Sequence, residues 1–146
     1  MKIAIASDHA GFELKECLLK ELKEKYEMVD FGAYNESSVD YPIISFKAAE
    51  SVSKKECDVG ILICGTGIGS SIAANKVDGI RAALCHCTEF AAMSRKHNDA
   101  NIIVLPGRFV ACHYAQEIVK VWLETQFEAG RHQRRVEQIN EYENNR

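Results

Sequence analysis

The segment Val59-Gly60-Ile61-Leu62-Ile63-Cys64-Gly65-Thr66-Gly67-Ile68-Gly69 decides the fold of this chain. Its first half is continuously apolar, which is typical of a strand covered on both faces, as in a parallel sheet. Its second half is rich in glycine, which lets a backbone turn sharply and approach a ligand closely. A helix is expected to start near Ser70. The segment therefore predicts a buried parallel strand followed by a ligand-binding loop.

Other short apolar runs lie on both sides of this segment and alternate with stretches of helical periodicity. Together they predict five strands, at residues 2–6, 27–31, 58–64, 80–84 and 101–105. This alternation predicts an α/β fold, a doubly wound, Rossmann-like three-layer sandwich with a five-stranded parallel sheet and right-handed crossovers. The polar tail beyond Gly130 carries only a thin apolar stripe and predicts a C-terminal helix at roughly 131–146. We expect residues 1–146 to form a single domain.

Composition excludes several classes of protein. With 146 residues, 47% hydrophobic and 27% charged, the chain has the make-up of a globular domain rather than a disordered one. Its net charge of -3 argues against nucleic acid as a partner. No apolar run reaches the ~18 residues of a membrane helix, and no signal peptide opens the chain, so we expect a cytoplasmic protein without membrane contact. The six cysteines are then expected to be free thiols.

In sheets of this kind, ligands bind at the carboxyl ends of the strands. The loops expected there contain Ser7-Asp8-His9-Ala10-Gly11, Cys64-Gly65-Thr66-Gly67-Ile68-Gly69, Cys85-His86-Cys87 and Pro106-Gly107-Arg108. The amides of the glycine loop and the following helix N-terminus predict an anion cradle. The loop matches neither the dinucleotide fingerprint nor the P-loop.

Several of these residues also have a purely structural interpretation. Thiols near helix N-termini act as bases or nucleophiles, but Cys64 can equally fill the end of a buried strand. Asp8 either caps the first helix or, with His9, contacts a sugar. Arg131 and Arg135 stand one helical turn apart and can grip a phosphate, or they belong to a solvated basic stretch.

The histidines and the Cys85-His86-Cys87 motif also have competing interpretations. The motif lacks a second ligand pair at zinc spacing, so we expect no metal. His113 and His132 are expected to be ordinary exposed histidines. His97 and Asn98 pose a geometric problem, because a helix of about 15 Å carries them back to the amino edge of the sheet, away from the cradle. His97 is therefore either structural or part of a neighbouring subunit's site.

Five motifs in order along nearly the whole chain resemble ribose-5-phosphate isomerase type B. The wider family also contains allose-6-phosphate and galactose-6-phosphate isomerases. The motifs are Ser7-Asp8-His9-Ala10-Gly11, the run at 61–69, the pair at 73–76 and 79–82, Arg95-Lys96-His97-Asn98-Asp99, and the stretch at 130–136.

This resemblance implies interconversion of ribose 5-phosphate and ribulose 5-phosphate through an enediolate, without metal or cofactor. It implies that Cys64 is the base, that His97 opens the furanose ring, and that Thr66 completes the catalytic set. Ser70 stands where some relatives carry a glutamate base, which places the chain in the cysteine subgroup. The implied substrate contacts are Asp8, His9, Gly65, Gly67, Ile68, Gly69, Asn98, Arg108, Arg131 and Arg135.

The expected partner is a small sugar phosphate, bound by a homodimer or tetramer whose active site is shared between subunits. Two alternatives remain open at this point. One is an isomerase of a six-carbon phospho-sugar such as allose 6-phosphate or galactose 6-phosphate. The other is a non-catalytic phosphate or nucleotide module, which has no need of Cys64.

Overall fold

All five strands of the central sheet run parallel, in the order β2-β1-β3-β5-β4, in the computed structural model, which describes residues 1–145. Each strand overlaps one of the predicted runs, so the predicted α/β fold is confirmed. The strands are β1 Lys2–Ser7, β2 Glu27–Asp30, β3 Val59–Cys64, β4 Ala82–Leu84 and β5 Ile102–Pro106. The helices are η1 His9–Gly11, α1 Phe12–Leu22, α2 Tyr41–Ser53, α3 Ile68–Ala74, α4 Thr88–Asn98, α5 Cys112–Glu124 and α6 Arg131–Asn144.

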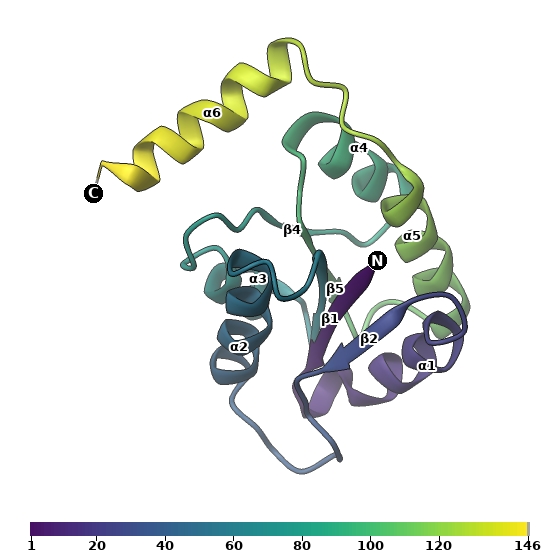
Figure 1. Ribbon diagram of the computed structural model, residues 1–146. Coiled ribbons are helices and arrows are strands. Elements are labelled where there is room, and N and C mark those ends of the chain that lie inside the picture. Colours follow the sequence, from purple (N-terminus) through teal and green to yellow (C-terminus); the bar gives the residue numbers. More distant parts are fainter. Residues whose placement is uncertain (146) are drawn as a thin grey trace.

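The two faces of the sheet are covered by different helices (Figure 1). Successive side chains of a strand point to opposite faces. Accordingly Ile3 and Ile5 of β1 pack in one cluster, with residues of α1 and α5, while Ala4 and Ala6 pack in another, with residues of α2 and α3. Because both faces of the sheet are buried, the strand sequences are continuously apolar and do not alternate between apolar and polar residues.

Helix α6 lies outside these layers (Figure 1). It packs against α4 near its N-terminus, where His132 and Val136 are buried. At its other end the Glu143 carboxylate accepts a hydrogen bond of 2.9 Å from the Gly79 amide. The expectation that His132 is exposed was wrong, because the α4–α6 contact covers its ring. Within residues 1–145, no helix is both long and apolar enough to cross a membrane.

The expectation that all six cysteines are free thiols was also wrong. Cys17 of α1 and Cys112 of α5 form a disulfide, with Cα atoms 6.2 Å apart. The two residues are 95 positions apart in the chain, and only the side-by-side packing of α1 and α5 brings them together. Cys57, Cys64, Cys85 and Cys87 are free.

Candidate functional site

Three loops meet at the carboxyl edge of the sheet. The Asp8 amide donates to the Ile63 carbonyl oxygen (3.1 Å), the Gly107 amide to that of Cys64 (2.8 Å), and the Arg108 amide to that of Gly65 (3.0 Å). Strand β1 has β2 on one side and β3 on the other, so the chain reverses its direction across the sheet here. Such a reversal point is where open α/β sheets bind ligands.

Cys64 is the last residue of β3, and its side chain is only 4% exposed. The chain then turns into α3 at Gly67, which has a φ of 78°. A Cβ atom at Gly67 would lie 2.4 Å from Leu84 Cδ1, so both the backbone angle and the lack of space require glycine. The first amides of a helix have no intrahelical partner, and in α3 these include the amides of Gly69 and Ser70, which follow the Cys64 loop. Thr66 stabilises the turn, because its hydroxyl accepts from the Ile68 amide at 3.3 Å.

Arg108 and Tyr41 cover two glycines of this loop. A Cβ atom on Gly65 would lie 3.3 Å from Arg108 Nη1, so the guanidinium brings a positive charge directly against the loop. A Cβ atom on Gly69 would lie 2.5 Å from Tyr41 Cζ. Tyr41 was not among the expected site residues. It stands in the first turn of α2, beside Pro42, and only the packing of α2 brings it against Gly69.

Asp8 and His9 lie at the end of β1. One oxygen of the Asp8 carboxylate accepts from the Gly11 amide at 2.9 Å, so the capping role of this residue is real. His9 Nδ1 accepts from the Val39 amide at 3.4 Å. A neutral imidazole whose Nδ1 is an acceptor carries its proton on Nε2, which can then donate to an anion.

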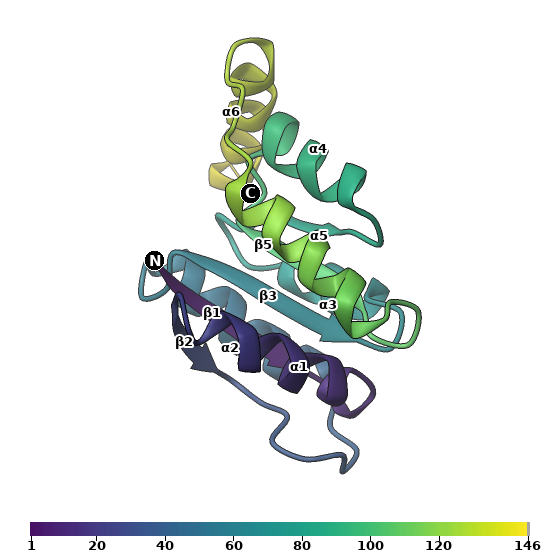
Figure 2. The same cartoon turned by 90° about the vertical axis from the view of Figure 1, so that its right-hand side faces the viewer.

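His97 and Asn98 lie away from Cys64, at the end of α4. Helix α4 starts after the carboxyl end of β4 and ends before the amino end of β5, so its last turn lies at the opposite edge of the sheet from Cys64 (Figure 2). This is the geometric problem that the sequence raised. The His97 ring stacks on the His132 ring with 4.2 Å between centroids and 13° between planes. Glu128 Oε2 lies 4.0 Å from the Nε2 atom of each ring.

His97, Glu128 and His132 have the composition of a metal site, since their ligand atoms lie within 4.8 Å of one another. The two rings are stacked, and the Nε2 atom of each lies near the same Glu128 oxygen. The geometry therefore suits a pair of imidazoles that face one carboxylate. Burial, followed by the charges of His97, Arg131 and Arg135, lowers the pKa of His132.

The three arginines of α6 are all exposed, but they differ in direction. Arg135 lines a groove with Asn75 at the end of α3 and with Tyr142. Arg134 is two residues from both buried residues of the helix, His132 and Val136, and so lies on the side opposite to them. Arg131 lies one turn before Arg135 on the same side.

A family model for ribose/galactose isomerase matches residues 3–139 of this chain. The chain belongs to the ribose/galactose isomerase family. Ribose-5-phosphate isomerase B of Escherichia coli (strain K12) is 46% identical over 146 residues, covering 99% of this chain and 98% of that protein. The resemblance in the motifs is thus confirmed, and the chain is an isomerase. A non-catalytic binding module does not fit this family.

Solved structures agree closely with this isomerase. The ribose-5-phosphate isomerase B of Clostridium thermocellum superposes with a TM-score of 0.97 at 53% identity, covering 99% of each chain. The enzyme of Mycoplasma genitalium, solved with bound ribulose-5-phosphate, gives a TM-score of 0.94 at 44% identity, covering 98% of this chain and 96% of that one.

The Cys85-His86-Cys87 motif of the isomerase offers poor metal ligands. Cys85 is 1% exposed, and this burial raises its pKa to about 11. The motif also lacks a second pair of ligands at the spacing of a zinc site. In the first turn of α4, the carboxylate of Glu89 accepts hydrogen bonds, and these lower its pKa.

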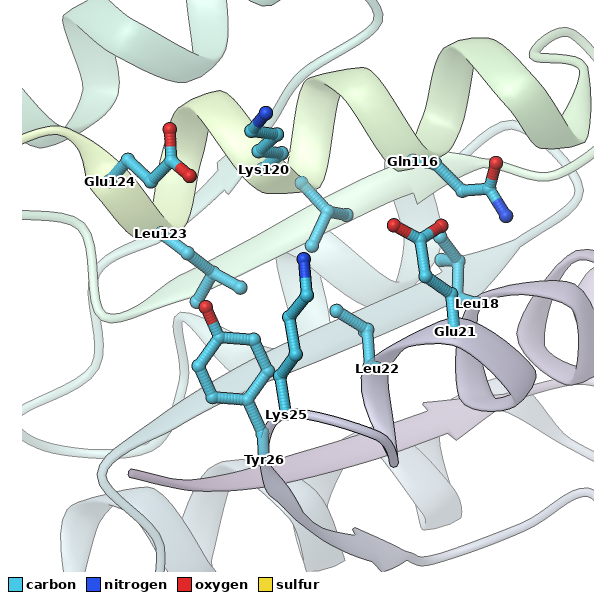
Figure 3. A pocket seen from close by; sticks show the side chains of 10 residues that line it. Leu18, Glu21, Leu22, Lys25, Tyr26, Gln116, Lys120, Leu123 and Glu124 are labelled. Carbon is cyan, nitrogen blue, oxygen red and sulfur yellow. The ribbon is translucent and has the colours of Figure 1, made fainter.

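The isomerase also has hollows away from the glycine loop. A groove between α1 and α5 has a volume of only about 30 Å³, and its charged and aromatic rim includes Glu21, Lys25, Tyr26, Lys120 and Glu124 (Figure 3). It is too small for a sugar phosphate. Two larger hollows of about 500 and 440 Å³ lie beside β4, lined in part by Phe90, Met93 and Ile139.

Proposed function

We propose that this isomerase interconverts ribose 5-phosphate and ribulose 5-phosphate without a metal ion, with Cys64 as the base. The observation that carries the proposal is the buried Cys64 thiol at the start of a glycine loop that Arg108 covers. A thiolate beside oriented amides can take a proton next to a carbonyl, while the amides stabilise the negative charge that develops on oxygen.

In the forward direction, Cys64 removes the proton from C2 of the open-chain aldose, and the electron pair forms the C1–C2 double bond of the enediolate. A proton then passes from O2 to O1 of the enediolate, and the same thiol returns its proton to C1, so that an electron pair on O2 forms the carbonyl at C2. The amides of residues 65–69 face the two oxygens in this scheme, with the Thr66 hydroxyl beside them. Asp8 and His9 hold the rest of the sugar phosphate, and Arg108 adds positive charge near the loop.

The remaining groups come, in this proposal, from a second subunit. His97 opens the furanose ring, Asn98 contacts the sugar, and Arg131 and Arg135 bind the phosphate. Two features support a homodimer: His97 lies at the opposite edge from Cys64 of its own chain, and exposed Phe90 and Met93 (57% and 45%) flank the unpaired edge of β4. A second copy that covers this edge also protects its backbone groups.

The choice of a five-carbon substrate is supported by the relatives named for ribose 5-phosphate, one of them solved with ribulose-5-phosphate. An isomerase of allose 6-phosphate or galactose 6-phosphate uses the same base. Turnover of ribose 5-phosphate and allose 6-phosphate is therefore measured side by side, each with and without a chelator. We expect a higher kcat/KM for ribose 5-phosphate than for allose 6-phosphate, and no change in either value when the chelator is added. A higher kcat/KM for allose 6-phosphate would instead assign the six-carbon substrate.

The base is tested with Cys64→Ala, which should abolish isomerisation and leave the fold intact. The direct measurement is solvent deuterium exchange at C1 of ribulose 5-phosphate, because this exchange needs the base but not ring opening. Cys64→Ser should also be poor, since a hydroxyl is far less acidic than a thiol. Cys57→Ala is the matched control: Cys57 is another buried free cysteine, 2% exposed, at the amino end of β3. Near-normal exchange in folded Cys64→Ala would refute the assignment.

A further inference from the structure

Lys15 of α1 is a buried cation that has no part in the scheme above. Its side chain is 0% exposed, and its Nζ atom donates to Asp30 Oδ1 (2.8 Å), Asp30 Oδ2 (2.7 Å) and the Ala33 carbonyl oxygen (2.5 Å). These contacts use all three protons of the ammonium. The rings of Phe12 and Tyr34 lie 5.5 and 5.3 Å from Nζ. The Glu16 carboxylate is 3.7 Å away on the exposed side. Because an unpaired buried charge is very costly, this arrangement holds only while Asp30 and Ala33 stay in place.

The contacts of Lys15 fix the turn that follows β2. Asp30 Oδ1 also accepts from the Gly32 amide at 2.9 Å. The Ser7 amide donates to the Gly32 carbonyl oxygen at 2.6 Å, and the Ala33 amide donates to the Ser7 carbonyl oxygen. The turn is thus tied on one side to α1 and on the other to the end of β1, directly before Asp8 and His9.

The segment that leaves this turn reaches the site itself. Its residue Val39 gives the amide that donates to His9 Nδ1, and Asp40 and Tyr41 then begin α2 against Gly69. The amide of Val39 holds the proton of neutral His9 on Nε2, the nitrogen left free to donate to a ligand. A displaced segment removes that amide and allows either nitrogen to carry the proton.

We propose that Lys15 is a positioning residue for substrate binding: through Asp30 and Ala33 it holds the segment at 30–39 so that Val39 fixes the tautomer of His9. This inference rests on the proposed function, in which His9 contacts the sugar phosphate. Lys15 acts through His9 and touches no reacting atom.

The test compares Lys15→Met, which removes the charge at similar length, with Lys20→Met, the matched control on an exposed position of α1. The ¹⁵N signals of the His9 imidazole are recorded at about pH 8, where a free imidazole is neutral, and are assigned by their loss in His9→Gln. We expect Lys15→Met to convert a single Nε2-protonated tautomer into a mixture. The KM for ribose 5-phosphate should rise roughly tenfold with little change in kcat, as for one lost hydrogen bond to a charged group. Lys20→Met should change neither.

Two further variants keep the test decisive. Val39→Pro removes the amide that reaches His9 and leaves Lys15 and Asp30 unchanged, and it should give the same imidazole signals as Lys15→Met. Asp30→Asn, which preserves size, replaces Lys15→Met if that variant does not fold. A single unchanged His9 tautomer in folded Lys15→Met or Asp30→Asn would overturn the proposal. The imidazole signals are recorded on the enzyme without substrate. They therefore test the role of Lys15 even if ribose 5-phosphate is not the substrate.

Discussion

At the scale of single residues, His132 should make folding sensitive to acid. Its pKa is lowered from the ordinary value of 6.5, first by burial and then by neighbouring positive groups. The unfolded chain therefore binds a proton before the folded one does, so the free energy of unfolding falls as the pH drops below 6.5, until the lower pKa of the folded state is passed. His132→Phe keeps a ring against His97 but cannot titrate, and should flatten this decline.

The measurement is chemical denaturation at intervals from about pH 7 to about pH 5, compared with wild type. His113→Phe serves as the control, because the His113 side chain is 87% exposed and lies 3.3 Å from the carboxylate of Glu117 on the surface of α5. A decline of equal steepness in wild type and His132→Phe would mean that the buried imidazole does not cause it.

At the scale of elements, α6 should present two arginines to the substrate and one to solvent. Arg135 lines the groove at Asn75, whereas Arg134 lies opposite the buried side of the helix. Arg135→Ala should lower kcat/KM for ribose 5-phosphate roughly ten- to hundredfold, as for the loss of a charge-assisted contact of ~1.5–3 kcal/mol. KM should rise, and kcat should fall as well, because the phosphate grip orients the reacting carbons.

Arg134→Ala is the matched control on the same helix and should have little effect. Steady-state kinetics of the two variants at one ionic strength provide the comparison, since screening affects exposed charges equally. If both variants show the same small decrease in kcat/KM, the arginines of α6 do not bind the phosphate and belong to a solvated basic stretch.

At the scale of the whole molecule, one site should draw on two chains. Cys64→Ala and His97→Ala are each expected to be inactive, but a mixed dimer contains one intact site, formed by Cys64 of one chain and His97 of the other. Random exchange makes half of the dimers mixed, with one of two sites intact, so roughly a quarter of the wild-type activity should return. Activity is measured before and after exchange in dilute denaturant, with mass spectrometry to show that mixed dimers have formed. Mixed dimers without activity would exclude the shared site.

The sequence alone determined the architecture and predicted one half of the proposed site. Continuous apolar runs such as 59–64 specify strands buried on both faces, and glycine after such a strand specifies a turn at the carboxyl edge of the sheet. These are local signals, carried by the residues that adopt the structure. Topology then brings Asp8, Cys64 and Arg108 to one edge, and the same rule showed that His97 could not join them within one chain.

Tertiary structure alone decided the contacts between segments far apart in the chain. The ring of His132 is buried because α6 packs on α4, and Cys17 meets Cys112 because α1 lies beside α5. Tyr41 contacts Gly69, and Lys15 of α1 contacts Asp30 at the end of β2, only once these elements have packed together. Neither periodicity nor motif spacing encodes such pairings, since each depends on the packing of whole elements. The burial of a charge like that of Lys15 is therefore decided by its partners in space, not by its neighbours in sequence.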